Sequence, residues 1–262
     1  MVVSADEHHA GHHGEDDDHH RDPDDGAAAP LPTPVRPQAA SGRVGARHRG
    51  SVCQKGVAAR GSVAAVFDRL LQCFDVEEHV VLRSPVGFLA LHGGIEPGTE
   101  GIAVAASVAA GASAYVVTQP RSLGWHVSSH RIVTADVPRL AAFLDHVDVV
   151  VSVHGYFRPE QRDALFVGGG RRDLAGDLAA RLRAVVGEMP VIDDLAAIPK
   201  SMRGIDPRNP VNRSRGGGVQ LELPHRARTD ARAVVDGRLS IAARVTGVLT
   251  DFARDVTRER AA

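Results

Sequence analysis

Two largely apolar segments place the strongest constraint on the fold of this chain. Residues 86–91 read VGFLAL and residues 147–153 read VDVVVSV. A continuous apolar run such as the first is typical of a strand that is buried in a helix-covered, parallel sheet, and the second segment also has the pattern of a strand. Each run is followed at once by His-Gly, at His92 and at His154. The two runs therefore predict sheet strands that end in the same way.

Strand and helix patterns alternate along the rest of the folded part. We expect further strands at residues 80–82, 114–118, 165–167, 191–192 and 219–223. We expect helices at residues 62–74, 100–110 (with Thr99 as a candidate cap), 137–146, 173–186 and 231–256, the last as one helix or two. This alternation predicts an α/β three-layer sandwich with a mostly parallel mixed sheet. In such sheets functional residues gather at the carboxyl ends of the strands.

The formal net charge of −1 averages three unlike segments. Residues 1–25 carry −8, residues 26–60 carry +6, and residues 61–262 carry +1. Residues 1–60 are His/Asp-rich and then Arg/Pro/Ala-rich, without periodic apolar positions, so we expect a disordered tail before a domain at 61–262. The histidines of this tail are either solvated or collect metal. The nearly neutral domain argues against a strongly basic nucleic-acid binder.

The beginning of the chain contains acids and histidines where a secretory signal would have a basic and then an apolar segment. No apolar run approaches the roughly 18–20 residues that span a bilayer. We therefore expect a cytoplasmic protein with no membrane or nucleic-acid partner. Whether it is a monomer or an oligomer stays open.

Candidate metal ligands follow from the two strand ends. His92 and His154 end the apolar runs, and Glu96 lies four residues after His92. The glycine after each histidine allows a sharp turn. Two histidines and a carboxylate are usual protein ligands of a catalytic zinc ion. The alternative is that the two histidines are ordinary polar loop residues.

A third motif, NPVNRSRGGGVQLELP, covers residues 209–224. Within VQLEL, Gln220 and Glu222 share one face and the apolar residues share the other. Glu222 could act as a general base, or it could be an exposed carboxylate on an edge strand. Asn212 and Arg213 offer donors that suit a substrate carboxylate.

Five motifs occur in an order that resembles the phage-type poly-γ-glutamate hydrolase family, over roughly residues 67–228. They are LHGGIEPGTE (91–100), WHVSS (125–129), VHGY (153–156), VGGG (167–170) and NPVNRSRGGGVQLELP (209–224). The resemblance implies a zinc carboxypeptidase-like fold, a Zn²⁺ cofactor, and hydrolysis of γ-glutamyl amide bonds in poly-γ-glutamate or a related acidic peptide.

Carried over by motif, the resemblance implies that His92, Glu96 and His154 are the zinc ligands. It also implies that Glu222 is the general base that activates water at the metal. The loop before Glu96 is a residue shorter than in many members, which makes Glu100 a rival ligand. We prefer Glu96, because Glu100 is expected in the first turn of a helix, where the helix dipole explains a carboxylate.

Candidate substrate contacts are Asn212, Arg213 and the arginines after the glycine turn, Arg171 and Arg172. They could hold a substrate carboxylate or stabilise an oxyanion, although solvated arginines are the simpler alternative. His126, in the WHVSS motif, is a candidate to line the cleft or a packing histidine. In a nearly neutral domain, attraction of an acidic substrate would come from motif-loop arginines: Arg171, Arg172, Arg203, Arg208, Arg213 and Arg215.

Two other functions compete with this hypothesis. One is a deacylase of small N-acyl amino acids, like the aspartoacylase–succinylglutamate desuccinylase group, which would have a closed pocket where a polymer needs an open, arginine-lined groove. The other is a non-catalytic metal-binding protein that keeps the fold. The intact set of candidate ligands and base argues against the second alternative.

Overall fold

The computed structural model describes residues 65–161, 163–229, 233–235 and 237–262. The expected tail, residues 1–60, and the domain boundary at residue 61 lie outside this part of the chain. None of the described helices is both long enough and apolar enough to cross a bilayer.

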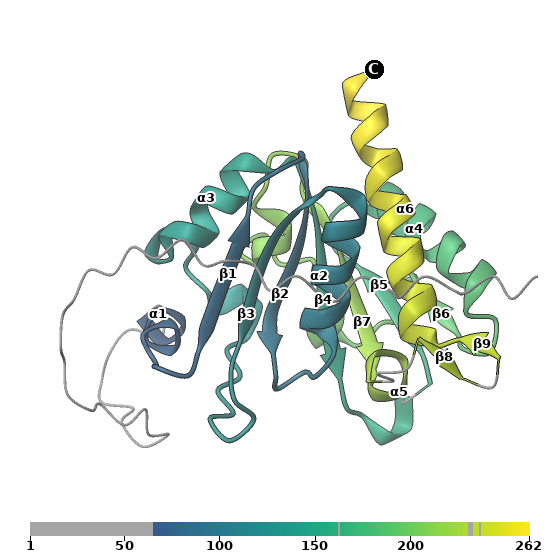
Figure 1. Cartoon of the computed structure of the whole chain (residues 1–262), viewed down its shortest axis with the longest axis horizontal. Helices are drawn as coiled ribbons and strands as arrows, with labels where there is room; N and C mark the ends of the chain where they lie inside the picture. Colours follow the sequence, from purple (N-terminus) through teal and green to yellow (C-terminus); the bar gives the residue numbers. More distant parts are fainter. Residues whose placement is uncertain (1–64, 162, 230–232, 236) are drawn as a thin grey trace, which may run out of the picture. The chain divides into compact units, whose positions relative to one another are not determined.

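A seven-stranded mixed sheet with the order β1-β3-β2-β4-β7-β5-β6 forms the middle of the described part (Figure 1). Strands β3, β2, β4 and β7 are parallel neighbours, β1 and β5 run antiparallel to β3 and β7, and β6 is parallel to β5. The sheet confirms the predicted α/β class. The strands are β1 (Glu77–Val81), β2 (Val86–Gly93), β3 (Ser113–Thr118), β4 (Val149–Tyr156), β5 (Leu165–Gly168), β6 (Val191–Ile192) and β7 (Gly218–Pro224).

Helices cover both faces of the sheet and make the expected three layers (Figure 1). Helices α2, α4 and α6 pack against one face, which includes Val151 and Val153. Helices α1 and α3 pack against the other face, which includes Leu89 and Val150. The helices are α1 (Ala65–Leu71), α2 (Thr99–Ala110), α3 (Pro138–His146), α4 (Arg172–Val185), α5 (His225–Arg228) and α6 (Ile241–Ala261).

The sequence pattern of α3 shows why such segments become helices. Leu140, Phe143 and Leu144 are buried at the three- and four-residue spacing of one helix face. Pro138 occupies the first position, where its fixed φ fits and no backbone N–H is needed. The buried stripe orients α3 toward the core that it shares with α1.

Two local predictions are wrong. The expected helix at residues 231–256 begins only at Ile241, because the Ser240 hydroxyl caps it by accepting a hydrogen bond from the Ala243 N–H at 3.1 Å. Before it, β8 (Val234–Val235) and β9 (Arg238–Leu239) pair as a short hairpin. The cap of α2 is Gly98 at φ 94°, not Thr99. The Thr99 hydroxyl instead donates to the Glu96 carbonyl at 2.8 Å.

Candidate metal centre and cleft

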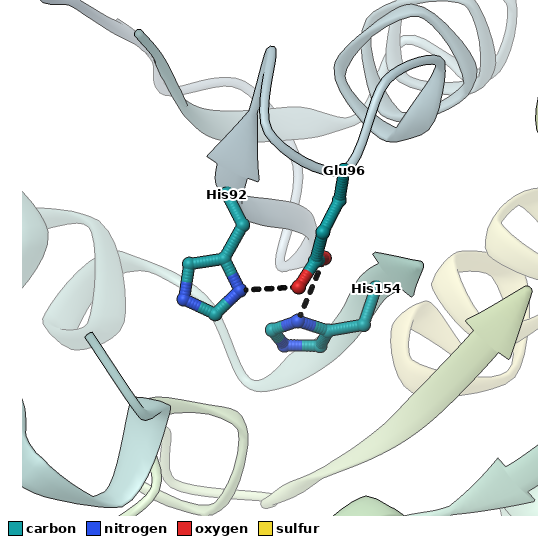
Figure 2. Close-up of side chains that lie close together, drawn as sticks. All are labelled: His92, Glu96 and His154. Atoms are coloured by element: carbon teal, nitrogen blue, oxygen red, sulfur yellow. Dashed lines mark hydrogen bonds and ion pairs between the residues drawn. The ribbon is translucent and has the colours of Figure 1, made fainter. Parts of the chain in front are cut away.

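His92, Glu96 and His154 lie together at the carboxyl ends of β2 and β4 (Figure 2). One ligand atom from each residue lies within 4.8 Å of the other two, and all three residues are buried. The Glu96 carboxylate bridges the histidines, with Oε1 2.9 Å from Nδ1 of His92 and Oε2 3.4 Å from Nδ1 of His154. Their proximity makes this cluster a candidate metal site.

An irregularity in β2 brings His92 to this side of the sheet. Ala90 pairs with Val116 and Gly93 pairs with Thr118, so β2 contains one more residue than β3 over this stretch. Strict alternation would place His92 on the face of Ala90, which packs with α2, α4 and α6. An extra residue in one strand re-aims the side chains that follow it. His92 accordingly contacts the carbonyl of Val127, a residue of the opposite core.

The turn after β2 places Glu96 over both strand ends. Gly94 adopts φ 81°, a left-handed conformation that favours glycine. The Glu96 N–H then donates to the His92 carbonyl at 2.9 Å, which closes a tight turn. Across the sheet, the Gly155 N–H donates to Glu96 Oε2 at 2.8 Å. Backbone hydrogen bonds therefore position this carboxylate relative to both histidine-bearing strands.

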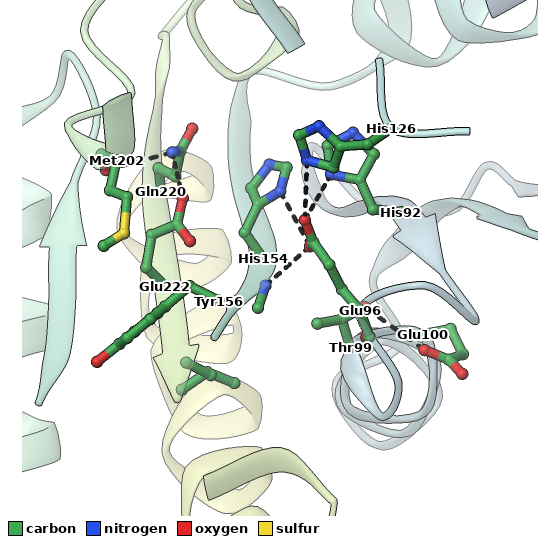
Figure 3. Close-up of polar contacts among 12 residues, drawn as sticks. His92, Glu96, Thr99, Glu100, His126, His154, Tyr156, Met202, Gln220 and Glu222 are labelled. Atoms are coloured by element: carbon green, nitrogen blue, oxygen red, sulfur yellow. Dashed lines mark hydrogen bonds and ion pairs between the residues drawn. The ribbon is translucent and has the colours of Figure 1, made fainter. Parts of the chain in front are cut away.

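Glu100, the rival ligand, lies in the first turn of α2, as expected. It is not part of the cluster formed by His92, Glu96 and His154. Figure 3 shows its carboxylate at a distance from these residues, beyond Thr99. The structure therefore brings Glu96, and not Glu100, to the two histidines.

Burial and mutual charge perturb the titration of the cluster. Burial alone would raise the pKa of Glu96, but the charge of His92 and hydrogen bonds from the surrounding histidines hold that pKa well below its usual value. Burial lowers the pKa of His154. Burial also opposes the charged form of His92, yet Glu96 raises the pKa of His92 above its usual value. The cluster thus favours a charged carboxylate between two imidazoles.

The chemistry of these residues fits a zinc ion. Nε2 of His92 lies 2.9 Å from the Val127 carbonyl oxygen, so this nitrogen donates, and Nδ1, which faces Glu96, is the nitrogen that would lose its proton to bind a metal. Nε2 of His154 is buried and has no hydrogen-bond partner among the described residues. Two imidazoles and one carboxylate also leave a coordination position open for catalysis. Zn²⁺ therefore suits this donor set.

Glu222 lies opposite the cluster on β7 (Figure 3). Strand β7 is an interior strand, so the exposed edge-strand interpretation of Glu222 is wrong. Glu222 pairs with His154 in the register of β4 and β7, and only 6% of its surface is exposed. Burial raises the pKa of Glu222 well above its usual value, and the negative charge of Glu96 raises it further.

A chain of amides orients Glu222. Nε2 of Gln220 donates to Glu222 Oε1 at 2.8 Å, and Nδ2 of Asn209 donates to Gln220 Oε1 at 2.9 Å. Both amide residues are buried. Gln220 and Glu222 share a face of β7, as the alternation predicted, and this common face makes the hydrogen bond possible.

Arg228 connects the three segments that follow the candidate site residues. Its buried guanidinium donates to the carbonyls of Pro97, Leu223 at 3.2 Å and Tyr156 at 3.4 Å. These carbonyls follow Glu96, Glu222 and His154 in the chain, each by one or two residues. The sequence contains no signal that distinguishes Arg228 from the many other arginines.

The candidate site opens into a cavity of about 840 Å³, a size typical of ligand sites. One side is made by the segment that contains His126, Ser128 and His130. His126 lies beside His92, with Nε2 3.5 Å from Glu96 Oε1, and its side chain is 58% exposed. The other side, next to Glu222, contains residues 156–158 and 200–207, without Arg203. Figure 3 shows His126 and Met202 on these two sides.

The four other predicted substrate residues do not line this cavity. Arg171 donates to Asp173 Oδ2 at 2.6 Å and to the Gly216 carbonyl at 2.9 Å. Arg172 donates to the carbonyl of Asp193. The remaining two residues are Asn212, which bonds the backbone of Gly170, Gly204 and Asp206 at 2.9, 2.7 and 2.9 Å, and Arg213, which is exposed. Sequence reasoning missed Arg158, Lys200 and Asn209, which do line the cavity.

The fold is thus a mixed α/β sheet that carries a buried His-Glu-His cluster, a candidate metal site, with a glutamate facing it. Residues 68–245 match the poly-γ-glutamate hydrolase family, and the chain belongs to this family.

The chain is also similar to individual proteins. It is 32% identical over 142 residues to UPF0714 protein YndL of Bacillus subtilis (strain 168), covering 53% of each chain. It therefore spans about half the length of that curated relative.

Two solved structures resemble the fold. The structure of a bacteriophage poly-γ-glutamate hydrolase matches with a TM-score of 0.57 and 22% identity, over 70% of this chain and 89% of that one. A structure described as zinc-free apo YndL matches with a TM-score of 0.57 and 25% identity, over 70% and 91%.

Proposed function

We propose that this chain is a zinc-dependent hydrolase that cleaves γ-glutamyl amide bonds in poly-γ-glutamate or a related acidic peptide. The observation that carries the proposal is the buried cluster of His92, Glu96 and His154 facing Glu222 in a member of the poly-γ-glutamate hydrolase family. The description of one YndL structure as zinc-free supports zinc as the metal.

His92, Glu96 and His154 would hold the zinc ion. When bound, zinc polarises the scissile carbonyl and lowers the pKa of a water molecule toward about 7. The deprotonated histidine nitrogens and the charged carboxylate are the forms that bind metal. The low pKa of Glu96 keeps its carboxylate in that form.

Glu222 supplies the proton transfers in this proposal. Gln220 holds Oε1 of Glu222, which leaves Oε2 for the substrate side. Glu222 accepts a proton from the attacking water at this oxygen and donates it to the amide nitrogen as the carbon–nitrogen bond breaks. Burial raises the pKa of Glu222, which makes its carboxylate a stronger base toward the proton of the attacking water.

The test is incubation of the zinc-loaded full chain with poly-γ-glutamate while chain length is followed by size-exclusion chromatography. We expect shortening by the wild-type protein. Glu222→Gln should lower kcat by about 100-fold or more, in the range of a lost general base, while bound zinc stays the same. Glu259→Gln, an exposed change on α6, is the matched control.

The alternatives make different predictions for the same samples. Cleavage of a small N-acyl amino acid without shortening of the polymer would favour the deacylase. Zinc binding without hydrolysis of either substrate would favour a non-catalytic protein. Full activity of zinc-loaded Glu222→Gln would contradict the role of Glu222 as the base.

A further inference from the structure

The fixed positive charges of the cavity lie on the wall next to Glu222. Among the described residues, the arginine and lysine side chains that line the cavity are Arg158 and Lys200, and both are exposed. Asp206 lies on the same wall, but Arg208 neutralises it through bonds of 2.8 Å to Oδ2 and 3.1 Å to Oδ1. The wall therefore presents a net positive surface to a ligand.

A hydrogen bond joins the two segments that carry these cations. Nη2 of Arg158 donates to Oγ of Ser201 at 2.9 Å, and Lys200 is the neighbour of Ser201 in the short 3-10 helix Lys200–Met202. Arg158 follows β4 and lies four residues after His154. Its charge reaches the reacting groups, because it is one of the charges that oppose the raised pKa of Glu222.

The arginines of the motif loops are occupied elsewhere or lie outside the cavity. Arg203 donates to the Ile198 carbonyl at 2.9 Å, and Arg215 donates to Asp148 Oδ1 at 2.7 Å. Arg208 is paired with Asp206, and Arg213 does not line the cavity. Attraction of an acidic substrate to this cavity must come from other cations.

The same wall also exposes apolar surface. Phe157 is 79% exposed and Ile205 is 47% exposed, and both line the cavity beside the two cations. Ligand sites typically combine apolar side chains with a few well-placed polar or charged groups. A γ-linked glutamyl residue combines the two matching features, since two methylene groups separate the α-carbon, which carries the free carboxylate, from the γ-carbonyl.

We propose that Arg158 and Lys200 bind the free α-carboxylate of the γ-glutamyl residue next to the scissile amide. This assignment rests on the proposed function and names its specificity-determining residues. Arg158 offers the planar fork that binds a carboxylate with two hydrogen bonds. Lys200 adds a second positive charge on the same wall.

The experiment compares a γ-linked glutamate trimer with the same trimer in which the α-carboxyl groups are carboxamides. We expect Arg158→Gln and Lys200→Gln each to lower kcat/KM for the charged trimer by about 10-fold or more, the range for a lost hydrogen bond to a charged group. Activity on the carboxamide trimer should stay within about 2-fold. Arg226→Gln, an exposed arginine that pairs with Asp163, is the matched control. An equal fall on both trimers, or no fall, overturns the assignment.

A binding measurement separates this proposal from the proposed function. Calorimetry of the zinc-loaded Glu222→Gln protein with the charged trimer needs no turnover. We expect the Kd to rise at least about 10-fold when Arg158→Gln is added, and binding to weaken with ionic strength. Wild-type protein that cleaves neither trimer would contradict the hydrolase function alone. No binding of the trimer, or equal binding by the two proteins, overturns the role of the cations.

Discussion

The ends of β2 and β4 look alike in sequence, yet the structure builds them differently. Residues 89–93 read LALHG and residues 151–155 read VSVHG. In β2, Leu89 and Leu91 pack toward α1 and α3. In β4, Val151 and Val153 pack toward α2, α4 and α6. Corresponding residues of the two similar motifs therefore point to opposite faces of the sheet.

The register between the strands shows the same offset. LALHG begins at Leu89 and VSVHG begins at Val151, but Val151 pairs with Phe88 and Leu89 pairs with Ser152. The two motifs are therefore shifted by one residue relative to each other. Without a correction, the two histidines would lie on opposite faces, because side chains alternate along a strand. The extra residue in β2 between Ala90 and Gly93 supplies this correction. Similar strand ends are thus not equivalent, and one irregularity decides whether the two histidines lie on the same face of the sheet.

The largest loss of zinc affinity should come from replacing either His92 or His154. We expect His92→Ala and His154→Ala each to weaken zinc binding by more than about 100-fold, beyond the 10–100-fold typical of residues that only support a ligand. Competition with a chromogenic chelator measures this affinity. His79→Ala, a change on β1, is the control and should keep it. Wild-type zinc affinity in either variant would show that the replaced histidine is not a zinc ligand.

A smaller effect is expected from Arg228, which holds the turn after β2 to the segment after β4. Arg228→Met leaves three carbonyls without their donor and should weaken zinc binding by about 10-fold. Zinc affinity and the thermal unfolding of the metal-free chain should be measured in parallel. Arg226→Met is the control on the same short helix. A lower Tm with unchanged zinc affinity would leave Arg228 with a purely structural role.

The glycines after the histidines should respond differently to alanine. A Cβ at Gly93 would lie 2.6 Å from the Val117 carbonyl oxygen, and the backbone cannot yield easily. A Cβ at Gly155 would lie 2.3 Å from Nε of Arg228, whose side chain can move. We expect Gly93→Ala to destabilise by about 1–3 kcal/mol and Gly155→Ala to destabilise less but to weaken zinc binding.

Chemical denaturation and chelator competition test these two expectations. Gly101→Ala is the control, because nothing lies within 4 Å of its Cβ position in α2 and alanine favours a helix. A larger loss of stability in Gly155→Ala than in Gly93→Ala would reverse the predicted contrast.

The smallest effect, a change in the free energy of unfolding, is expected at Ser152, where the two motifs differ in polarity. The Ser152 hydroxyl is buried and has no partner among the described residues, and the corresponding residue of β2 is Ala90. Ser152→Ala should change the free energy of unfolding by less than about 1 kcal/mol, because it removes an unsatisfied group. The reciprocal change, Ala90→Ser, should cost about 1–3 kcal/mol. Similar losses of stability in both variants would mean that the surroundings of Ser152 and Ala90 accommodate a hydroxyl equally well.

Local patterns predicted much of the sheet and the cluster. The apolar runs located β2 and β4, and alternation in VQLEL placed Gln220 and Glu222 on one face. The irregularity in β2 escaped prediction because it is defined by pairing with β3, which no local pattern encodes. The roles of Arg228 and Arg158 escaped for a similar reason, since their partners are distant in the chain or belong to another loop.

The position of β7 has a consequence for how the protein is made. Strands β4 and β5 follow each other in the chain, but β7 lies between them in the sheet. A growing chain therefore exposes all three candidate ligands long before Glu222 and Arg228 have been synthesised. The contact from Arg228 to Pro97 spans 131 residues, and contacts of such separation form slowly. The site can thus be completed only after β7 and Arg228 have been synthesised and have reached the earlier strands.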